Sequence, residues 1–165
     1  MKKYLVILVL ALCAAVQSNA QTTWNVRAGG GLFSYAFEED WDYYSETGFG
    51  LMVSLETNIP FAKGSQWCIS PSIIVAADLD YRELSLPMHV GYKIPVGDSG
   101  MFIPKVGPFV GYMYVPYIND DGPVIFGPSV ELAYEYKHFI TALNASLDVI
   151  ETIGPHVFLS IGYKF

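Results

Sequence analysis

The chain has 165 residues, of which 52% are hydrophobic and 15% aromatic, and its formal net charge at pH 7 is −7. This length fits one domain, and the acidic balance excludes nucleic-acid binding, which requires basic patches that neutralise phosphates. Half of the chain is hydrophobic, yet after residue 20 no apolar run approaches the ~20 residues that a membrane-spanning helix requires.

The first twenty residues have the pattern of a secretory signal. Lys2 and Lys3 form a basic start, residues 4–16 are mostly apolar, and Ser18-Asn19-Ala20 is a small-residue cleavage site. Cleavage there would leave a domain of residues 21–165 with seven basic and sixteen acidic residues. An uncleaved anchor is the alternative, but the apolar stretch is too short for a spanning helix.

The rest of the chain alternates between apolar and small or polar residues with a period of two, which is typical of half-buried strands. Breaks rich in turn-forming residues divide it into eight segments, most of which reach the ~9 to 11 residues of a tilted membrane strand. We predict strands at 24–36, 48–59, 67–77, 83–94, 102–114, 124–136, 139–149 and 156–165. The first break, 37–47, is the longest and predicts a long outer loop.

The alternation also separates charge from apolar side chains. One parity carries Val26, Val53, Val130, Leu132, Leu159 and their equivalents in every segment, and it carries no charge. This pattern favours a barrel with an apolar outside facing lipid and a filled polar inside, because an eight-stranded barrel has little room for a pore. The opposite parity holds all the strand charges, four basic and five acidic: Arg27, Glu56, Glu83, Lys93, Lys105, Glu131, Glu135, Asp148 and Lys164.

Aromatic residues collect at the predicted strand ends, where a lipid–water boundary favours them. Trp24, Trp67, Tyr136 and Phe165 are among those expected near the periplasmic edge. Glycines are frequent on the polar parity, which suits a crowded interior. Five prolines, Pro71, Pro87, Pro104, Pro108 and Pro128, oppose this interpretation because each removes a ladder hydrogen bond, and they predict bulges or strand ends.

Three stretches resemble the middle strands of the small outer-membrane β-barrel domain family, the PorT-like and OmpA-like barrels. They are Leu84-Ser85-Leu86-Pro87, Val90-Gly91-Tyr92-Lys93 and Gly107-Pro108-Phe109-Val110-Gly111-Tyr112. The closing Tyr163-Lys164-Phe165 resembles the C-terminal signal read by the outer-membrane assembly machinery, with Tyr163 and Phe165 as its aromatic residues. The resemblance implies an eight-stranded, antiparallel, up-and-down transmembrane β-barrel in a Gram-negative envelope. It implies no activity, because members of the family differ in role.

The charged residues of the polar parity are candidates for an interior ion-pair network. Arg27 and Glu56 lie near the same end of neighbouring strands, and Lys105 relates in the same way to Glu131 and Glu135. We expect this network to fill the lumen, since buried charges are tolerated when they are paired. A small gated pore is an alternative function for the same residues.

The first break contains Glu38, Glu39, Asp40, Trp41 and Asp42. These residues are candidates for contact with a divalent cation, which would bridge to lipopolysaccharide phosphates, or with a protein partner. A solvated acidic loop is the favoured alternative, because the twelve-residue spacing of a calcium loop is absent. The three histidines show no metal-ligand spacing, and no catalytic, cofactor or metal site is predicted.

The sequence therefore predicts a non-enzymatic integral barrel of the outer membrane, with a structural or surface-interaction role. Its expected partners are outer-membrane lipid and lipopolysaccharide, the barrel assembly machinery during insertion, and an unidentified surface or periplasmic protein. A soluble exported barrel of lipocalin type, binding an apolar ligand, is the main alternative.

Overall fold

The computed structural model describes residues 22–39, 42–78, 82–114, 124–149 and 154–165, with the backbone alone at 35–39 and 42–46. The predicted signal segment, residues 1–20, lies outside these ranges, so its cleavage stays a prediction. Within the described residues, no helix is long and apolar enough to cross a membrane.

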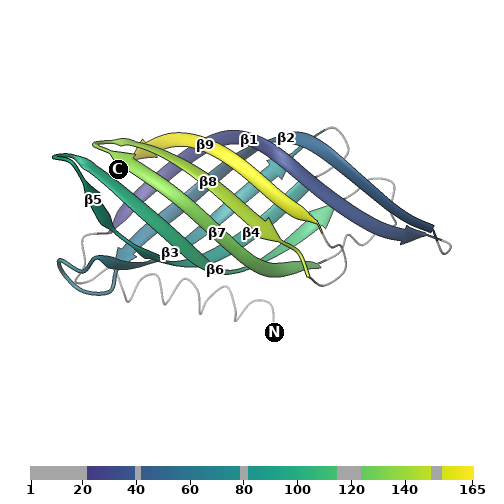
Figure 1. Cartoon of the computed structure of the whole chain (residues 1–165), viewed down its shortest axis with the longest axis horizontal. Helices are drawn as coiled ribbons and strands as arrows, with labels where there is room; N and C mark the ends of the chain where they lie inside the picture. Colours follow the sequence, from purple (N-terminus) through teal and green to yellow (C-terminus); the bar gives the residue numbers. More distant parts are fainter. Residues whose placement is uncertain (1–21, 40–41, 79–81, 115–123, 150–153) are drawn as a thin grey trace.

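The described strands form one closed antiparallel sheet (Figure 1). Their order around the wall is β4-β3-β2-β1-β9-β8-β7-β6, and pairing of β4 with β6 closes it. The short β5 continues β4 past Lys93 and pairs with β6 in the same register, so the wall has eight strands, as predicted. The bounds are β1 Thr23–Glu39, β2 Asp42–Pro60, β3 Trp67–Ala77, β4 Arg82–Tyr92, β5 Ile94–Val96, β6 Gly100–Tyr114, β7 Val124–Tyr136, β8 Phe139–Leu147 and β9 Pro155–Lys164.

The two faces of the wall are divided as the alternation predicts. The apolar parity lies on the outside, where Val130 is 47% and Leu159 62% exposed, and Ile103, Phe33 and Phe158 point inward. Seven of the nine strand charges are buried in the interior, and Lys93 and Lys164 are half-buried at the end of the barrel where β1 begins and β9 ends. A closed wall without an edge thus presents an apolar outer surface, because the period-two pattern keeps the same sense in every strand.

The prolines do not produce the predicted bulges or strand ends. Pro104 and Pro128 lie within a continuous β6–β7 ladder, in which Pro108 pairs with Pro128. Pairs are missing between β3 and β4 after Pro71↔Met88, but pairing resumes at Ile74↔Ser85 in the same register. A proline removes one donor from one of its two ladders, and its fixed φ still allows an extended strand, so the register survives a local gap.

The prediction of a long first loop at 37–47 was wrong. β1 and β2 continue as a hairpin whose pairing reaches Glu39↔Asp42. Among the described residues, β9 pairs with β1 only as far as Phe33, and β3 pairs with β2 only from Leu51, so the outer part of the hairpin stands beyond its neighbours (Figure 1). The acidic run suggested a loop, but the aromatic residues around it favour strand, and an established ladder extends by local pairing.

Glycines allow close approach at the seam between β1 and β9, where the first and last strands meet. A Cβ on Gly29 would meet the carbonyl oxygen of Leu159 and lie 2.6 Å from the Cα of Ser160. Both atoms belong to the backbone, so neither moves away cheaply. The seam therefore depends on the absence of a side chain at this position.

Gly29→Val is expected to destabilise the barrel by about 1–3 kcal/mol, because the added side chain forces the backbones of β1 and β9 apart. The free energy of unfolding, measured by urea titration of the folded barrel in detergent, tests this. Ala28→Val is the matched control, since Ala28 is exposed on the outer face one residue away. Equal effects of the two substitutions would contradict the close-packed seam.

Candidate functional site

Four charged side chains form a closed ring inside the barrel. Arg27 Nη2 lies 3.2 Å from Glu56 Oε2 and 2.9 Å from Glu131 Oε2. Lys105 Nζ lies 2.6 Å from Glu56 Oε1 and 2.7 Å from Glu131 Oε1. All four side chains are at most 1% exposed, and two positive charges balance two negative ones. We refer to Arg27, Glu56, Lys105 and Glu131 as the ion-pair ring.

The ion-pair ring joins opposite parts of the wall. Arg27 and Glu56 come from the neighbouring strands β1 and β2, and Lys105 and Glu131 from the neighbouring β6 and β7. In the strand order, β9 and β8 separate β1 from β7, and β3 and β4 separate β2 from β6. The contacts of Glu131 with Arg27 and of Glu56 with Lys105 therefore cross the lumen.

Neutral polar groups surround the ring. Asn25 Nδ2 donates to Glu56 Oε1 at 3.0 Å, and Arg27 Nε donates to Ser54 Oγ at 3.2 Å. These bonds offset part of the large desolvation cost of burying four charges. Three buried atoms near the ring, Asn25 Oδ1, Arg27 Nη1 and His89 Nδ1, have no hydrogen-bond partner among the described residues, which is typical of positions that bind internal water.

His89 also lies in this region, although the sequence analysis did not single it out. Candidate ligand atoms of His89, Glu56 and Glu131 lie within 4.8 Å of one another, and all three residues are buried. Every oxygen of the two carboxylates already contacts Arg27 or Lys105, and the ring has no net charge. A metal ion would have to displace those cations, so the grouping does not by itself indicate a metal centre. His89 Nε2 lies 3.0 Å from Ser129 Oγ.

The remaining predicted interior charges lie in two other places. At the end of the barrel where β9 ends, Lys164 Nζ lies 2.7 Å from Glu135 Oε2. Glu135 therefore pairs with Lys164, whereas the prediction paired it with Lys105. Lys105 is instead fully engaged by the ring, which Glu135 does not join. Toward the opposite end, His156 Nδ1 lies 3.0 Å from Glu83 Oε2, and Asp148 Oδ1 accepts a hydrogen bond from the backbone N–H of Phe126.

Lys93 lies at the same end of the barrel as Lys164, apart from the ring. No ion pair involving it occurs among the described residues. It follows Tyr92 at the junction of β4 and β5, and its side chain is half-buried. The predicted network is therefore divided in the structure. Four of the nine residues form the ion-pair ring, Glu135 pairs with Lys164, and Glu83, Asp148 and Lys93 lie apart from the ring.

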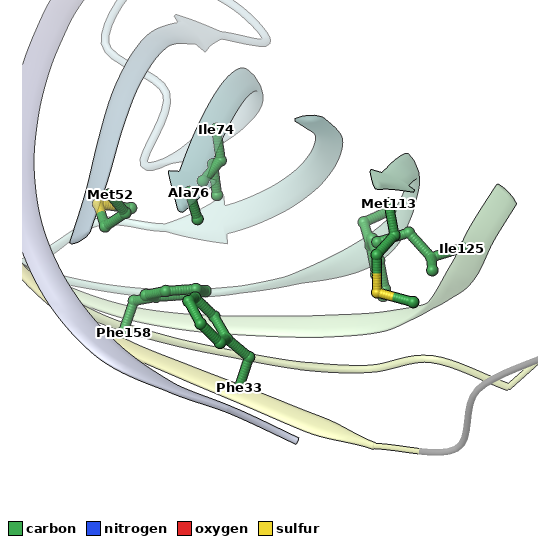
Figure 2. Close-up of a cluster of buried hydrophobic side chains, with 8 residues drawn as sticks. Phe33, Met52, Ile74, Ala76, Met113, Ile125 and Phe158 are labelled. Atoms are coloured by element: carbon green, nitrogen blue, oxygen red, sulfur yellow. The ribbon is translucent and has the colours of Figure 1, made fainter. Parts of the chain in front are cut away.

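Apolar layers lie on both sides of the ion-pair ring. Along β6 the inward positions run from Ile103 through Lys105 to Phe109 and Met113, so the ring lies between two apolar clusters. The cluster nearer the start of β1 and the end of β9 comprises Cys68, Ile103, Ala133, Ile140 and Ala142. The other is drawn in Figure 2 and comprises Phe33, Met52, Ile74, Ala76, Phe109, Met113, Ile125 and Phe158, from six strands.

The larger apolar cluster is packed across the lumen. Phe33 on β1 and Phe158 on β9 lie with ring centroids 5.6 Å apart, and Figure 2 shows them facing the space beneath Met52 and Ile74. All eight members are at most 3% exposed. A charge within an aromatic and aliphatic layer of this kind would lose its hydration.

The C-terminal aromatic residues lie outside the barrel at the seam. Tyr163 and Phe165 are 44% and 70% exposed, with ring centroids 4.9 Å apart. The Phe165 N–H donates to the carbonyl of Trp24 at 2.8 Å, which ties the last residue to the first strand. Their predicted role as an assembly signal stays a prediction, but both residues are accessible on the outer surface.

The predicted acidic contact site cannot be placed. Glu38, Glu39 and Asp42 belong to the hairpin strands, whose side chains here are outside the described part of the structure, and Asp40 and Trp41 fall outside it entirely. Cation or partner contact by these five residues therefore stays a prediction.

No family model and no curated protein matches the chain. Among solved structures, OprG from Pseudomonas aeruginosa is 14% identical, with a TM-score of 0.55 over 90% of this chain and 98% of that one.

Two further structures are similar to the same extent. The N-terminal β-barrel domain of Pseudomonas aeruginosa OprF is 9% identical, with a TM-score of 0.56 over 89% of this chain and 100% of that one. Neisserial surface protein A is 12% identical, with a TM-score of 0.56 over 86% of this chain and 95% of that one. These identities are low, so the likeness concerns the fold.

The chain thus has the fold of the small eight-stranded outer-membrane β-barrels. This is the fold that the resemblance of the middle strands implied. The interior of this barrel holds the ion-pair ring between two apolar clusters.

Proposed function

We propose that the chain is an integral outer-membrane β-barrel with a closed lumen and a structural or surface-interaction role, without enzymatic activity. The observation that carries the proposal is the inversion of the usual soluble pattern. Large apolar side chains cover the outside, and the charges are paired inside. An outer surface of this kind is stable only against lipid or detergent.

The lipocalin-type alternative requires the opposite arrangement. A soluble carrier needs a polar outside and an apolar cavity, whereas the inside of this barrel holds four ionised groups between two packed apolar layers. The similarity to solved outer-membrane barrels supports the same choice and favours the outer membrane as the location.

The surface-interaction role is supported by the hairpin of β1 and β2. It carries an acidic and aromatic sequence, and its pairing reaches Glu39↔Asp42 at the end of the barrel opposite Phe165 (Figure 1). With an even strand number, β1 begins and β9 ends on the same side of the membrane. We infer that this is the periplasmic side, as in outer-membrane barrels generally, so that the hairpin points to the cell exterior. Lipopolysaccharide, through a bridging divalent cation, and a surface protein are the partners we propose for it.

Insertion is tested by refolding the domain of residues 21–165 into lipid vesicles. The folded barrel is expected to migrate differently on gel electrophoresis before and after boiling and to need detergent or lipid to stay in solution. A monodisperse, detergent-free barrel would contradict the membrane assignment and support a soluble carrier.

Closure of the lumen is tested by planar-bilayer recording. Wild type and Glu56→Ala are both expected to give no step currents, because the apolar layer of Phe33, Phe109 and Phe158 persists when the ion-pair ring is broken. Heat-dependent migration of each variant confirms that it is folded. Reproducible steps in folded wild type would establish the gated pore and overturn the closed barrel.

A further inference from the structure

A recess opens at the end of the barrel where β1 begins and β9 ends. Its volume is about 730 Å³, and it is bordered by the first residue of β1, the last of β9, the turn between β2 and β3, and the junction of β4 and β5. The charged residues in its lining are Lys63, Lys93, Glu135 and Lys164. It lies on the terminus side of the smaller apolar cluster, whose neighbour Met101 also lines it, and is therefore separate from the ion-pair ring.

The recess is positively charged. Lys164 pairs with Glu135 at 2.7 Å, and Glu135 also accepts a hydrogen bond from Asn58 at 3.4 Å. In the described part of the chain, neither Lys63 nor Lys93 has an ion-pair partner. Three lysines against one glutamate leave two positive charges, and these belong to the two lysines without a partner.

This charge is opposite to that of the chain as a whole. After residue 20 the sequence has seven basic residues and sixteen acidic ones, and three of the seven basic residues line this one recess. Lysine ammonium groups bind phosphate as compact point charges, and a doubly charged phosphate would match the two uncompensated lysines better than a single carboxylate.

The surroundings of the recess are those of a lipid–water boundary. The rings of Trp67 and Tyr92 have centroids 4.9 Å apart, and Trp67 is half exposed on the outside. Tyr92 directly precedes Lys93 in the chain. The Tyr92 hydroxyl donates to the side chain of Gln66, which itself lines the recess. Tyrosine and tryptophan favour the membrane interface, because each combines an apolar ring with a polar group. In an inserted barrel this pair would therefore place the recess at the level of the lipid headgroups.

We propose that this recess binds a phosphate-bearing anion, with Lys63 and Lys93 as the residues that hold the phosphate. Two sources share that chemistry, the headgroup of an anionic phospholipid of the periplasmic leaflet and a free phosphate in the periplasm. The headgroup source rests on the proposed function, whereas the charged recess itself does not.

The proposal is tested by calorimetry on the folded domain of residues 21–165 in a neutral detergent. One arm titrates short-chain phosphatidylglycerol below its micelle concentration, and the other titrates inorganic phosphate. Lys63→Gln/Lys93→Gln is expected to weaken binding about tenfold or more, the loss that follows from removing two charged hydrogen-bond donors. Lys137→Gln is the matched control, since Lys137 lies in a turn at the same end and does not line the recess.

The results of the two titrations either support or overturn the phosphate site. Lysine-dependent binding of phosphatidylglycerol alone identifies the lipid, and lysine-dependent binding of inorganic phosphate identifies the free anion; both support the site. No binding in either arm, or equal weakening by Lys137→Gln, overturns it. Gel migration before and after boiling is recorded for every variant, so a failure of the barrel to fold in detergent is distinguished from a failure of the recess to bind.

Discussion

Lys105→Met is expected to destabilise the inserted barrel by about 3–5 kcal/mol, because it leaves two buried carboxylates with one cation. In the native ring the Lys105 ammonium contacts both Glu56 and Glu131, and it is fully buried. Its loss cannot be compensated by water from outside, since apolar layers lie on both sides. The free energy of unfolding, measured by urea titration in lipid vesicles, gives the value.

The double variant Lys105→Met/Glu131→Gln supplies the control for this prediction. It removes one charge of each sign and leaves the neighbouring pair Arg27–Glu56 intact, so most of the lost stability is expected to return. Lys137→Met, on an exposed turn, is expected to change the free energy of unfolding by no more than about 0.5 kcal/mol. A double variant as unstable as Lys105→Met would show that packing of the lysine stem, and not charge balance, sets the cost.

Val130→Arg is expected to cost ~2–4 kcal/mol if its side chain faces lipid at mid-depth. Val130 lies on β7 directly beside the ion-pair residue Glu131, and its side chain is on the outside of the wall. An arginine there must hold its charge in hydrocarbon or deform the bilayer around it. The cost is measured as the difference in the free energy of unfolding in lipid vesicles.

Tyr136→Arg is the matched control for Val130→Arg. Tyr136 is the last residue of the same strand and is exposed to the same degree, 47%, but it lies at the barrel end. Its substitution is expected to cost only ~0–1 kcal/mol, because an arginine near the interface reaches water. If both variants insert as stably as wild type, the outer face of β7 does not lie against lipid.

The positions of the strands along the chain were more predictable than the behaviour of single residues within them. Predicted strands at 67–77 and 124–136 coincide with β3 and β7, because alternation and turn residues are local signals. The prolines and the acidic run at 38–42 misled the prediction, since both depend on context. Pro104 is tolerated because the ladder between β6 and β7 stays continuous through it. The acidic segment extends the hairpin of β1 and β2 because the preceding residues of these strands are already paired.

The candidate site was predictable only in part, for a related reason. Arg27 with Glu56 and Lys105 with Glu131 are pairs on neighbouring strands, so parity and strand order bring them together. His89, Asn25 and Ser54 share the parity of those charges, which was the available signal, but neutral residues do not stand out on a polar face. The pairing of Glu135 with Lys164 depends on depth along the barrel, which a sequence pattern leaves undetermined.

The sequence by itself determined the eight strands, their order and the face that each side chain occupies, because a period of two and short connections are properties of neighbouring residues. Only the tertiary structure decided that Glu131 reaches Arg27 and that Glu56 reaches Lys105. Those contacts cross the lumen between strands that are not neighbours, so they depend on the closure, diameter and stagger of the barrel. These quantities belong to the whole sheet, and no single segment of the chain encodes them.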